Sequence, residues 1–459
     1  MNAPLLSTRA TVAAMILCAG SSASGDECPN VHPPIMVEPG FVSTSNVRVG
    51  GFSMDSDGTT LVIGDPYAEG TFGVSRSGAF SIHEHQLGGG WSPVAAFSGS
   101  LSQQRLGFSV AVRGGIVAVA GVGVTGRIYE RVVAPIGATW NQTALINIPG
   151  GTKAVRIDGE TVYAATRSSD NSSRSNIYEY TRTASGAWIG REIIHEVRLA
   201  SANGLTGWAV SGETMVCSFA GSNGSTSPSD VRVFRRVGAN WAQEAVLSGR
   251  TTSVFDGFGI FAAIDGDTIA IGANWWPYPL NNTGYARVYR RATDGTWPLE
   301  AEFTHPTAPS GSPNSGFGMS VALRGETLVI GSMLDDHGGI DSGTLYSWQR
   351  IAGQWTSRAS FAAANTPGAW IGWNVVITPE EVLSSAPGLF GVGGAIAFDT
   401  CSLNSGGGAT PRCLPGTLGL ITFANAFFAH DPFADYNLSG AISVQDFFDF
   451  MNDWFAGCL

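Results

Sequence analysis

Six tryptophans recur along the chain at a nearly constant interval of roughly fifty residues. Each follows a glycine by one to three positions, and the six are Trp91, Trp140, Trp188, Trp241, Trp297 and Trp355. A fixed period of this length is typical of repeat architectures, in which every repeat is one unit of supersecondary structure. The period therefore has to be explained before any local motif is assigned.

The segment ahead of each tryptophan is repeated as well, most clearly in GFGIFAAIDGDTIAIGA (257–273) and GFGMSVALRGETLVIGS (316–332). Two apolar runs flank a short turn that carries glycine, at Gly114, Gly159, Gly212, Gly266 and Gly325. Glycine suits a tight hairpin because the turn needs positive φ. A third run ending in YxR or FRR precedes the tryptophan strand. Each copy predicts one four-stranded antiparallel sheet, and radial repetition of such sheets predicts an all-β propeller.

Counting the copies predicts seven blades. The first spans about 51–97, whereas the seventh has three strands and no tryptophan strand. The segment 34–38 (PIMVE) can supply the missing outer strand by pairing antiparallel with Ala395–Phe398, which would close the ring. Cys28 and Cys401 flank these two segments, so we predict a disulfide between them. The alternative is that both are unpaired surface thiols.

The repeats resemble FG-GAP repeats, the blades of integrin α-subunit heads and of many bacterial surface proteins. The resemblance covers about residues 47–400 and rests on the strand openings Phe108–Ala111 and Phe317–Ala322, the closing pairs Ile63-Gly64 and Ile330-Gly331, and the Gly-x-Trp turns. It implies a propeller that serves as a binding scaffold. Metal-binding members carry an acidic loop between the first two strands. Here only Asp55 and Asp57 retain a trace of that loop, so we expect no calcium site in the blades.

Long, variable connections follow the second strand of most copies and open at the same end of each sheet as the link to the next copy. This end, called the rim below, is the predicted ligand surface. The loop 273–284 carries aromatic planes suited to sugar rings or to protein hot spots, namely Trp275, Trp276 and Tyr278. The loop 332–343 carries carboxylates that can contact a ligand or a cation, namely Asp335, Asp336 and Asp341. The alternatives are packing of the aromatics on a neighbouring blade and ordinary solvated aspartates.

The C-terminal stretch FADYNLSGAISVQDFFDF has the oxygen spacing of a calcium-binding loop. The predicted ligands are the side chains of Asp435, Asn437, Ser439 and Asp446 and the carbonyl of Ala441. An amphipathic helix over 445–455 is expected to follow. Serine and aspartate at two ligand positions predict weak binding of one calcium ion. The alternative is a metal-free helical hairpin that caps the chain.

A second copy of this unit, without its ligands, lies about two dozen residues earlier. The pair resembles a dockerin, the module that attaches secreted bacterial proteins to a cohesin-type partner, and the ending Gly457-Cys458 is similar to tails of secreted planctomycete proteins. The resemblance implies a small α-helical, EF-hand-like module at 412–459 after a Gly/Ser linker at 402–411. Cys413 and Cys458 flank the module and are predicted to form a disulfide. Cys217 is then left as a buried thiol in an apolar strand.

Residues 1–25 have the form of a secretory signal peptide, with Arg9 before an apolar run at 12–19 and small residues at 22–25. The run is too short to span a bilayer, and no later stretch is long or apolar enough to do so. A secreted chain without a membrane span is therefore expected, in surroundings where disulfides persist. The formal charge of −11 and the absence of a Lys/Arg cluster argue against nucleic acid as a partner.

No motif in the sequence matches a nucleophile elbow, a zinc-protease helix or a phosphate-binding loop. The pattern favours a secreted, non-enzymatic binding or adhesion protein, with a propeller at 26–401 whose rim binds an extracellular protein or glycan. The dockerin-like tail would attach it to a cohesin-like or other cell-surface protein. Two alternatives are an extracellular polysaccharide-degrading enzyme, a glycosidase or lyase, on the same scaffold and a structural surface-layer component.

Overall fold

The computed structural model describes residues 35–36, 51–69, 74–86, 90–122, 125–133, 138–166, 174–198, 207–219, 230–250, 257–274, 284–306, 315–362, 366–389 and 393–399. The predicted signal peptide (1–25), linker (402–411) and dockerin-like module (412–459) lie outside these residues. So do Cys28, Cys401, Cys413 and Cys458. The predictions made for these segments remain predictions.

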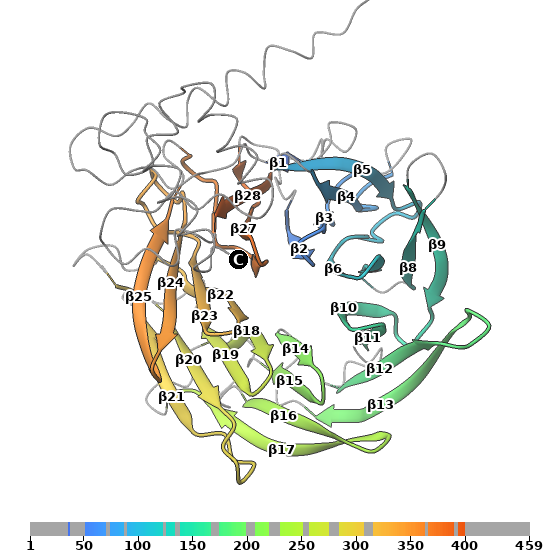
Figure 1. The fold of residues 1–459 in the computed structure, drawn as a ribbon. Helices are drawn as coiled ribbons and strands as arrows, with labels where there is room; N and C mark the ends of the chain where they lie inside the picture. Colours follow the sequence, from blue (N-terminus) through green and yellow to red (C-terminus); the bar gives the residue numbers. More distant parts are fainter. Residues whose placement is uncertain are drawn as a thin grey trace, which may run out of the picture.

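Seven four-stranded antiparallel sheets surround a central axis, which confirms the predicted seven-bladed propeller (Figure 1). Blades 1 to 3 consist of β2 (Ser53–Ser56), β3 (Thr60–Asp65), β4 (Ala79–His85) and β5 (Trp91–Ser98); β6 (Ser109–Arg113), β7 (Ile116–Ala120), β8 (Gly126–Val133) and β9 (Ala138–Ile146); and β10 (Thr152–Asp158), β11 (Thr161–Thr166), β12 (Arg174–Arg182) and β13 (Trp188–Arg198). Blades 4 and 5 consist of β14 (Trp208–Ser211), β15 (Thr214–Phe219), β16 (Asp230–Val237) and β17 (Asn240–Ser248); and β18 (Phe258–Asp265), β19 (Thr268–Ala273), β20 (Tyr285–Arg290) and β21 (Leu299–Thr304). Blades 6 and 7 consist of β22 (Phe317–Arg324), β23 (Thr327–Ser332), β24 (Thr344–Ile351) and β25 (Gln354–Phe361); and β26 (Val375–Ile377), β27 (Glu381–Ala386), β28 (Gly394–Asp399) and β1 (Ile35–Met36).

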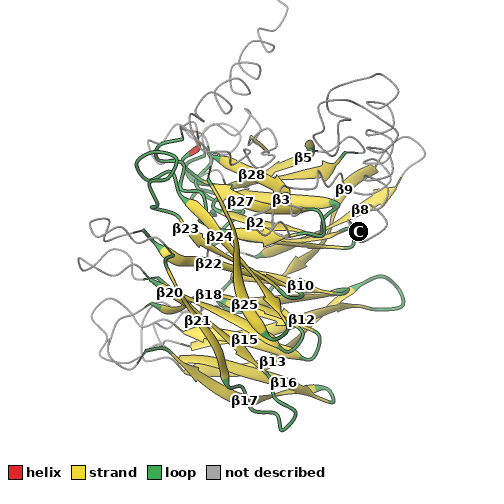
Figure 2. Ribbon diagram, turned by 60° about the vertical axis from the view of Figure 1, so that its left-hand side comes forward, coloured by secondary structure: helices red, strands yellow, loops and turns green. Residues whose placement is uncertain are grey.

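The hydrophobic core lies between successive blades rather than in one central mass. The second strand of a blade is buried on both faces, as in β3, β7, β19 and β27. These strands are the nearly continuous apolar runs of the repeats, as expected for strands covered on both sides. Outer strands such as β5 expose much of their surface. Figure 2 shows the sheets stacked side by side around the ring.

The glycines predicted for the first turn of each blade do adopt positive φ, between 52° and 56° at Gly114, Gly159, Gly212, Gly266 and Gly325. A different requirement acts on Gly64 at the end of β3. A Cβ at this position would lie 2.1 Å from the carbonyl oxygen of Gly107 in the next blade. A Cβ at Gly272 or Gly331 would likewise lie 2.2 or 2.3 Å from a backbone carbonyl oxygen of the next blade. The blades therefore approach one another through bare backbone.

Side chains of the innermost strands bridge to the backbone of the next blade. Asp55 accepts a hydrogen bond from the backbone N–H of Val112 (2.9 Å), and Asp57 accepts one from Gly114 N–H (2.9 Å). The same hydrogen bond recurs between later blades, where the backbone N–H groups of Gly212, Gly266 and Gly325 donate to the side chains of Asp158, Ser211 and Asp265. Because adjacent inner strands do not pair with each other, such bonds satisfy their otherwise open edges. The acidic trace at Asp55 and Asp57 thus has a structural role.

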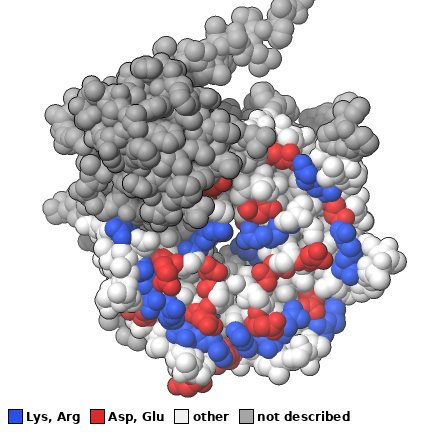
Figure 3. All heavy atoms as spheres, in the orientation of Figure 1, with Lys and Arg blue, Asp and Glu red and all other residues white. Residues whose placement is uncertain are grey.

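The recurring tryptophans are explained by a contact with the preceding blade. The indole N–H groups of Trp91, Trp188, Trp297 and Trp355 donate to Glu381, Glu130, Glu244 and Glu300, at 2.6–3.0 Å. An arginine from the same blade as the tryptophan binds three of these carboxylates, as Arg291 binds Glu244 at 2.6 Å. This hydrogen bond from Arg291 lowers the pKa of Glu244. Figure 3 shows basic and acidic side chains alternating along part of the edge of the molecule.

The ring closes as the sequence predicts. β1 pairs antiparallel with β28, with Ile35 opposite Ala395 and Met36 opposite Gly394. Two further hydrogen bonds join blade 7 to blade 1, from Trp373 Nε1 to the carbonyl of Phe52 (3.0 Å) and from Asn374 Nδ2 to that of Met54 (3.2 Å). The predicted buried thiol is confirmed, because Cys217 is free and inaccessible in β15.

Candidate binding surface

Of the predicted rim residues, the structure describes only those of the β23–β24 loop. Trp275, Trp276 and Tyr278 lie outside the described residues. So do the proposed calcium ligands Asp435, Asn437, Ser439, Ala441 and Asp446. The loop 332–343 brings Asp335, Asp336 and Asp341 close together, but each has a different environment.

Asp335 is the hydrogen-bonding centre of this loop. Its carboxylate accepts hydrogen bonds from His305 Nε2 (2.7 Å), Tyr346 OH (2.6 Å) and His337 Nδ1 (2.5 Å). The Asp335 side chain is 7% exposed, whereas that of His337 is 45% exposed. Although burial opposes ionisation, these hydrogen bonds hold the pKa of Asp335 well below its usual range. Asp335 therefore positions the loop from within the protein.

The other two aspartates lie at the surface of the loop. Asp336 accepts a hydrogen bond from the backbone N–H of Asp341 (2.9 Å), and Asp341 has a φ of 53°. Burial, together with the nearby Asp336 carboxylate, raises the pKa of Asp341. Ile340 next to them is 76% exposed. The sequence singled out the aspartates, but the most accessible apolar side chain of the loop is Ile340.

The loop pairs with the segment that leads into blade 7. Backbone N–H groups of Gly368, Trp370 and Ile371 donate to the carbonyls of Ile340, Asp341 and Ser342 at 2.8–3.2 Å. Blades 1 and 2 repeat this arrangement, because Gln103, Arg105 and Leu106 donate to Ser75, Arg76 and Ser77 at 3.0–3.1 Å. The two pairings hold rim residues rigidly at two places around the ring.

Backbone strain is concentrated in these two pairings. Six described residues other than glycine have positive φ, and five of them lie here: Arg76, Gln103, Arg105, Asp341 and Trp370. Each such residue costs about 1–3 kcal/mol, and such residues cluster where a protein binds ligands. An aromatic residue at φ 58°, as at Trp370, is especially unusual.

A group of half-buried aromatic side chains connects the two pairings across blades 7, 1 and 2. Phe52 contacts Phe108, Trp373 and Tyr67, with ring centroids 5.1, 5.6 and 6.0 Å apart. Trp370 lies 6.3 Å from Trp373, and the Arg105 guanidinium lies 5.2 Å from the ring centre of Tyr67. Trp, Tyr and Arg are the residues most enriched at energetic hot spots of interfaces. We call Phe52, Tyr67, Arg105, Phe108, Ile340, Trp370 and Trp373 the rim surface.

Sequence reasoning did not identify the rim surface. Phe52, Phe108 and Trp373 each follow a glycine that opens a repeat, and such residues are expected to belong to buried strands. Phe258 and Phe317 in the same motif are indeed fully buried. The two blades differ in register. Ser53 donates to the carbonyl of Gly107 in the next blade, and Ser320 donates in the same way to Gly372, so Ser53 and Ser320 are equivalent. Phe52 is therefore equivalent to Met319 and not to Phe317.

Asp65 lies at the rim end of β3 and provides a pH-dependent test. Its burial raises its pKa to about 6. Between pH 4 and pH 6 the unfolded chain has lost this proton while the folded chain retains it, so folded-state stability falls as pH rises. Asp65→Asn should remove this loss, because asparagine does not ionise. The free energy of unfolding of the variant minus that of the unsubstituted protein should therefore be about 3 kcal/mol larger at pH 7.5 than at pH 4. Urea unfolding of both proteins at the two pH values measures it, and an equal difference at both would contradict the prediction.

Within the described ranges, no three His, Cys, Asp or Glu side chains are grouped so as to hold a metal ion. The same residues include no helix with the length and apolar character needed to cross a membrane. The described rim thus offers aromatic, apolar and guanidinium groups on a rigid backbone, which suit the recognition of another molecule.

Comparisons with known proteins agree with this architecture. The FG-GAP repeat family matches residues 301–347. No curated protein matches the chain. Among solved structures, hydrazine synthase of Kuenenia stuttgartiensis is similar at 13% identity over 80% of this chain and 99% of that chain, with a TM-score of 0.51. Sqt1 from Chaetomium thermophilum is similar at 13% identity over 80% and 85% of the two chains, with a TM-score of 0.49. The likeness to hydrazine synthase concerns the fold alone, whereas an FG-GAP propeller suggests a binding or adhesion role.

Proposed function

We propose that this chain is a secreted, non-enzymatic binding protein whose rim surface captures an extracellular protein or glycan. The observation that carries the proposal is the concentration of strained backbone and half-buried aromatics on one end of an otherwise regular ring. Asp341 and Trp370 keep unfavourable φ values beside Ile340, which is 76% exposed, and Arg76 and Arg105 do so in the second pairing, between blades 1 and 2. Ordering these groups before the ligand arrives lowers the entropy cost of binding.

The test uses the purified full-length protein on arrays of extracellular glycans and cell-envelope proteins. Ile340→Asp should weaken capture about tenfold, because it replaces an exposed apolar side chain with a third carboxylate beside Asp336 and Asp341. Ile351→Asp is the matched control, since Ile351 is also exposed (45%) but is the last residue of β24, at the opposite end of the blade. Equal capture by both variants and the unsubstituted protein would reject the rim as the binding surface.

The proposal includes attachment by the C-terminal segment to a cohesin-like or other cell-surface protein. Its support is the ligand spacing from Asp435 to Asp446, which provides the oxygens that calcium prefers. Calorimetric titration of the full-length protein should detect one calcium ion, and the double variant Asp435→Ala, Asp446→Ala should abolish the heat. Heat that persists in the double variant would place the calcium elsewhere and contradict this assignment.

A further inference from the structure

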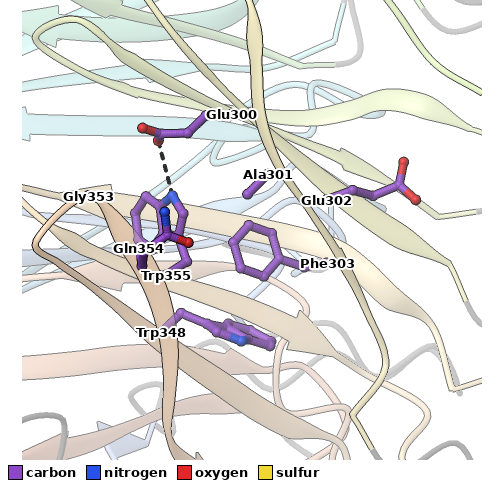
Figure 4. A pocket seen from close by; sticks show the side chains of 8 residues that line it. All are labelled: Glu300, Ala301, Glu302, Phe303, Trp348, Gly353, Gln354 and Trp355. Carbon is purple, nitrogen blue, oxygen red and sulfur yellow. Dashed lines mark hydrogen bonds between the residues drawn. The ribbon is translucent and has the colours of Figure 1, made fainter.

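A cavity of about 330 Å³ lies between the outer strands of blades 5 and 6 (Figure 4). Its walls come from β21 of blade 5 and from β24 and the β24–β25 hairpin of blade 6. Figure 4 shows Gln354 and Trp355 on one side, Phe303 and Trp348 beside them, and Glu302 on the other side. Its size is at the lower end of the range for small-molecule sites.

Aromatic rings held in fixed orientations form the apolar part of the cavity. Phe303 packs against Trp348 and Trp355, with centroid distances of 5.0 and 5.8 Å. The indole N–H of Trp355 donates to Glu300 at 3.0 Å, which fixes the plane of the ring. The equivalent tryptophans Trp140 and Trp241 are buried, whereas Trp355 is partly exposed. Trp355 therefore presents an oriented aromatic face at the cavity.

The carboxylates of the cavity are already paired with arginine. Glu300 binds Arg350 at 2.7 Å, and Glu302 binds Arg287 at 2.8 Å and also Arg250. The hydrogen bond from Arg250, together with that from Arg287, lowers the pKa of Glu302, so this group stays ionised. Arg350 also pairs with Glu326 at 3.4 Å, so three arginines balance three glutamates here, and this disfavours a charged ligand. A carboxylate oxygen that accepts one hydrogen bond can still accept another from a hydroxyl group.

We infer that this cavity binds one ring of a neutral saccharide. A pyranose ring has an apolar face of C–H groups, which suits the Trp355 plane, and a circumference of hydroxyl groups. Glu300 and Glu302 can accept hydrogen bonds from these hydroxyls, and the exposed Gln354 amide can both donate and accept. The cavity lies along the outer strands β21 and β25, and none of its lining residues belongs to the rim surface, so it is a second site.

The experiment titrates the full-length protein with neutral hexasaccharides, namely cellohexaose, xylohexaose and mannohexaose, and with hexalysine as a cationic probe. Binding is followed by tryptophan fluorescence and by calorimetry. We expect at least one hexasaccharide to bind. Trp355→Ala should weaken that binding at least about tenfold, and Gln354→Ala about threefold.

Trp188→Ala is the matched control. Trp188 is partly exposed and donates to Glu130, which also pairs with Arg182, so this variant breaks the same kind of inter-blade contact without touching the cavity. It should bind the saccharide as the unsubstituted protein does. Gln354→Ala keeps the test valid if Trp355→Ala fails to fold, because Gln354 is exposed in the hairpin.

Three results would overturn the inference: no hexasaccharide binds, both cavity variants bind as tightly as the unsubstituted protein, or only hexalysine binds in a Trp355-dependent way. Ile340→Asp separates this outcome from the proposed rim function. That variant should weaken capture at the rim about tenfold and keep saccharide binding.

Discussion

Gly64→Ala is expected to lower the free energy of unfolding by about 3 kcal/mol or more. The new Cβ would lie 2.1 Å from the Gly107 carbonyl oxygen and 2.4 Å from Ser53 Oγ. Ser53 Oγ itself donates to that carbonyl at 2.7 Å, so neither neighbour can move without separating blades 1 and 2. Overpacking a core typically costs about 1–3 kcal/mol, and here the obstacle is backbone rather than a flexible side chain.

Thermal and urea unfolding of Gly64→Ala measure this loss. Gly114→Ala is the control, because a Cβ there has nothing within 4 Å and only the positive φ of 52° opposes the substitution. We expect the control to cost about 1–2 kcal/mol. If Gly64→Ala were no more destabilising than Gly114→Ala, the direct backbone approach between blades would be wrong.

Asp335→Ala is the second substitution with a large expected effect, a loss of about 3–5 kcal/mol. It removes the acceptor that His305, His337 and Tyr346 share in the interior of the β23–β24 loop. The pKa of Asp335 is depressed, so its contribution is present above the unfolded-state value and is lost as pH falls through the lower folded-state value. The destabilisation should therefore be greatest at neutral pH.

Asp336→Ala is the matched control for Asp335→Ala. Asp336 is exposed, and its carboxylate accepts a backbone hydrogen bond from Asp341 within the same loop. Its removal should cost less than about 1 kcal/mol. Differential scanning calorimetry of the two variants at pH 7 compares them, and similar unfolding temperatures would show that Asp335 is not the centre of the loop.

The blades and their number were predictable because each blade is a local pattern. Glycine turns, apolar runs and the tryptophan period are all visible within one repeat. The pairing of Ile35 and Met36 with blade 7 followed from the one strand missing from the count. One detail was wrong, because Trp297 lies before its outer strand rather than in it. Pro298 follows Trp297, and β21 begins at Leu299.

Contacts between blades were less predictable, because the residues that contact the tryptophans do not recur at the same position in each repeat. The glutamates that accept from tryptophan lie on a third strand in blade 2 (Glu130), on a fourth strand in blade 5 (Glu300) and on a second strand in blade 7 (Glu381). The rim surface and the cavity between blades 5 and 6 arise from neighbouring blades in the same way. No single repeat contains either site, so sequence analysis of the repeats did not reveal them.

We propose the rim surface as the place where the protein meets its extracellular partner. Hydrogen–deuterium exchange of the full-length protein, with and without the envelope protein or glycan it captures, tests this most directly. We expect slower exchange in segments 74–78, 99–108, 332–343 and 366–373. Protection that spares these segments and appears only in the turns at the opposite end, such as 352–354, would contradict the claim.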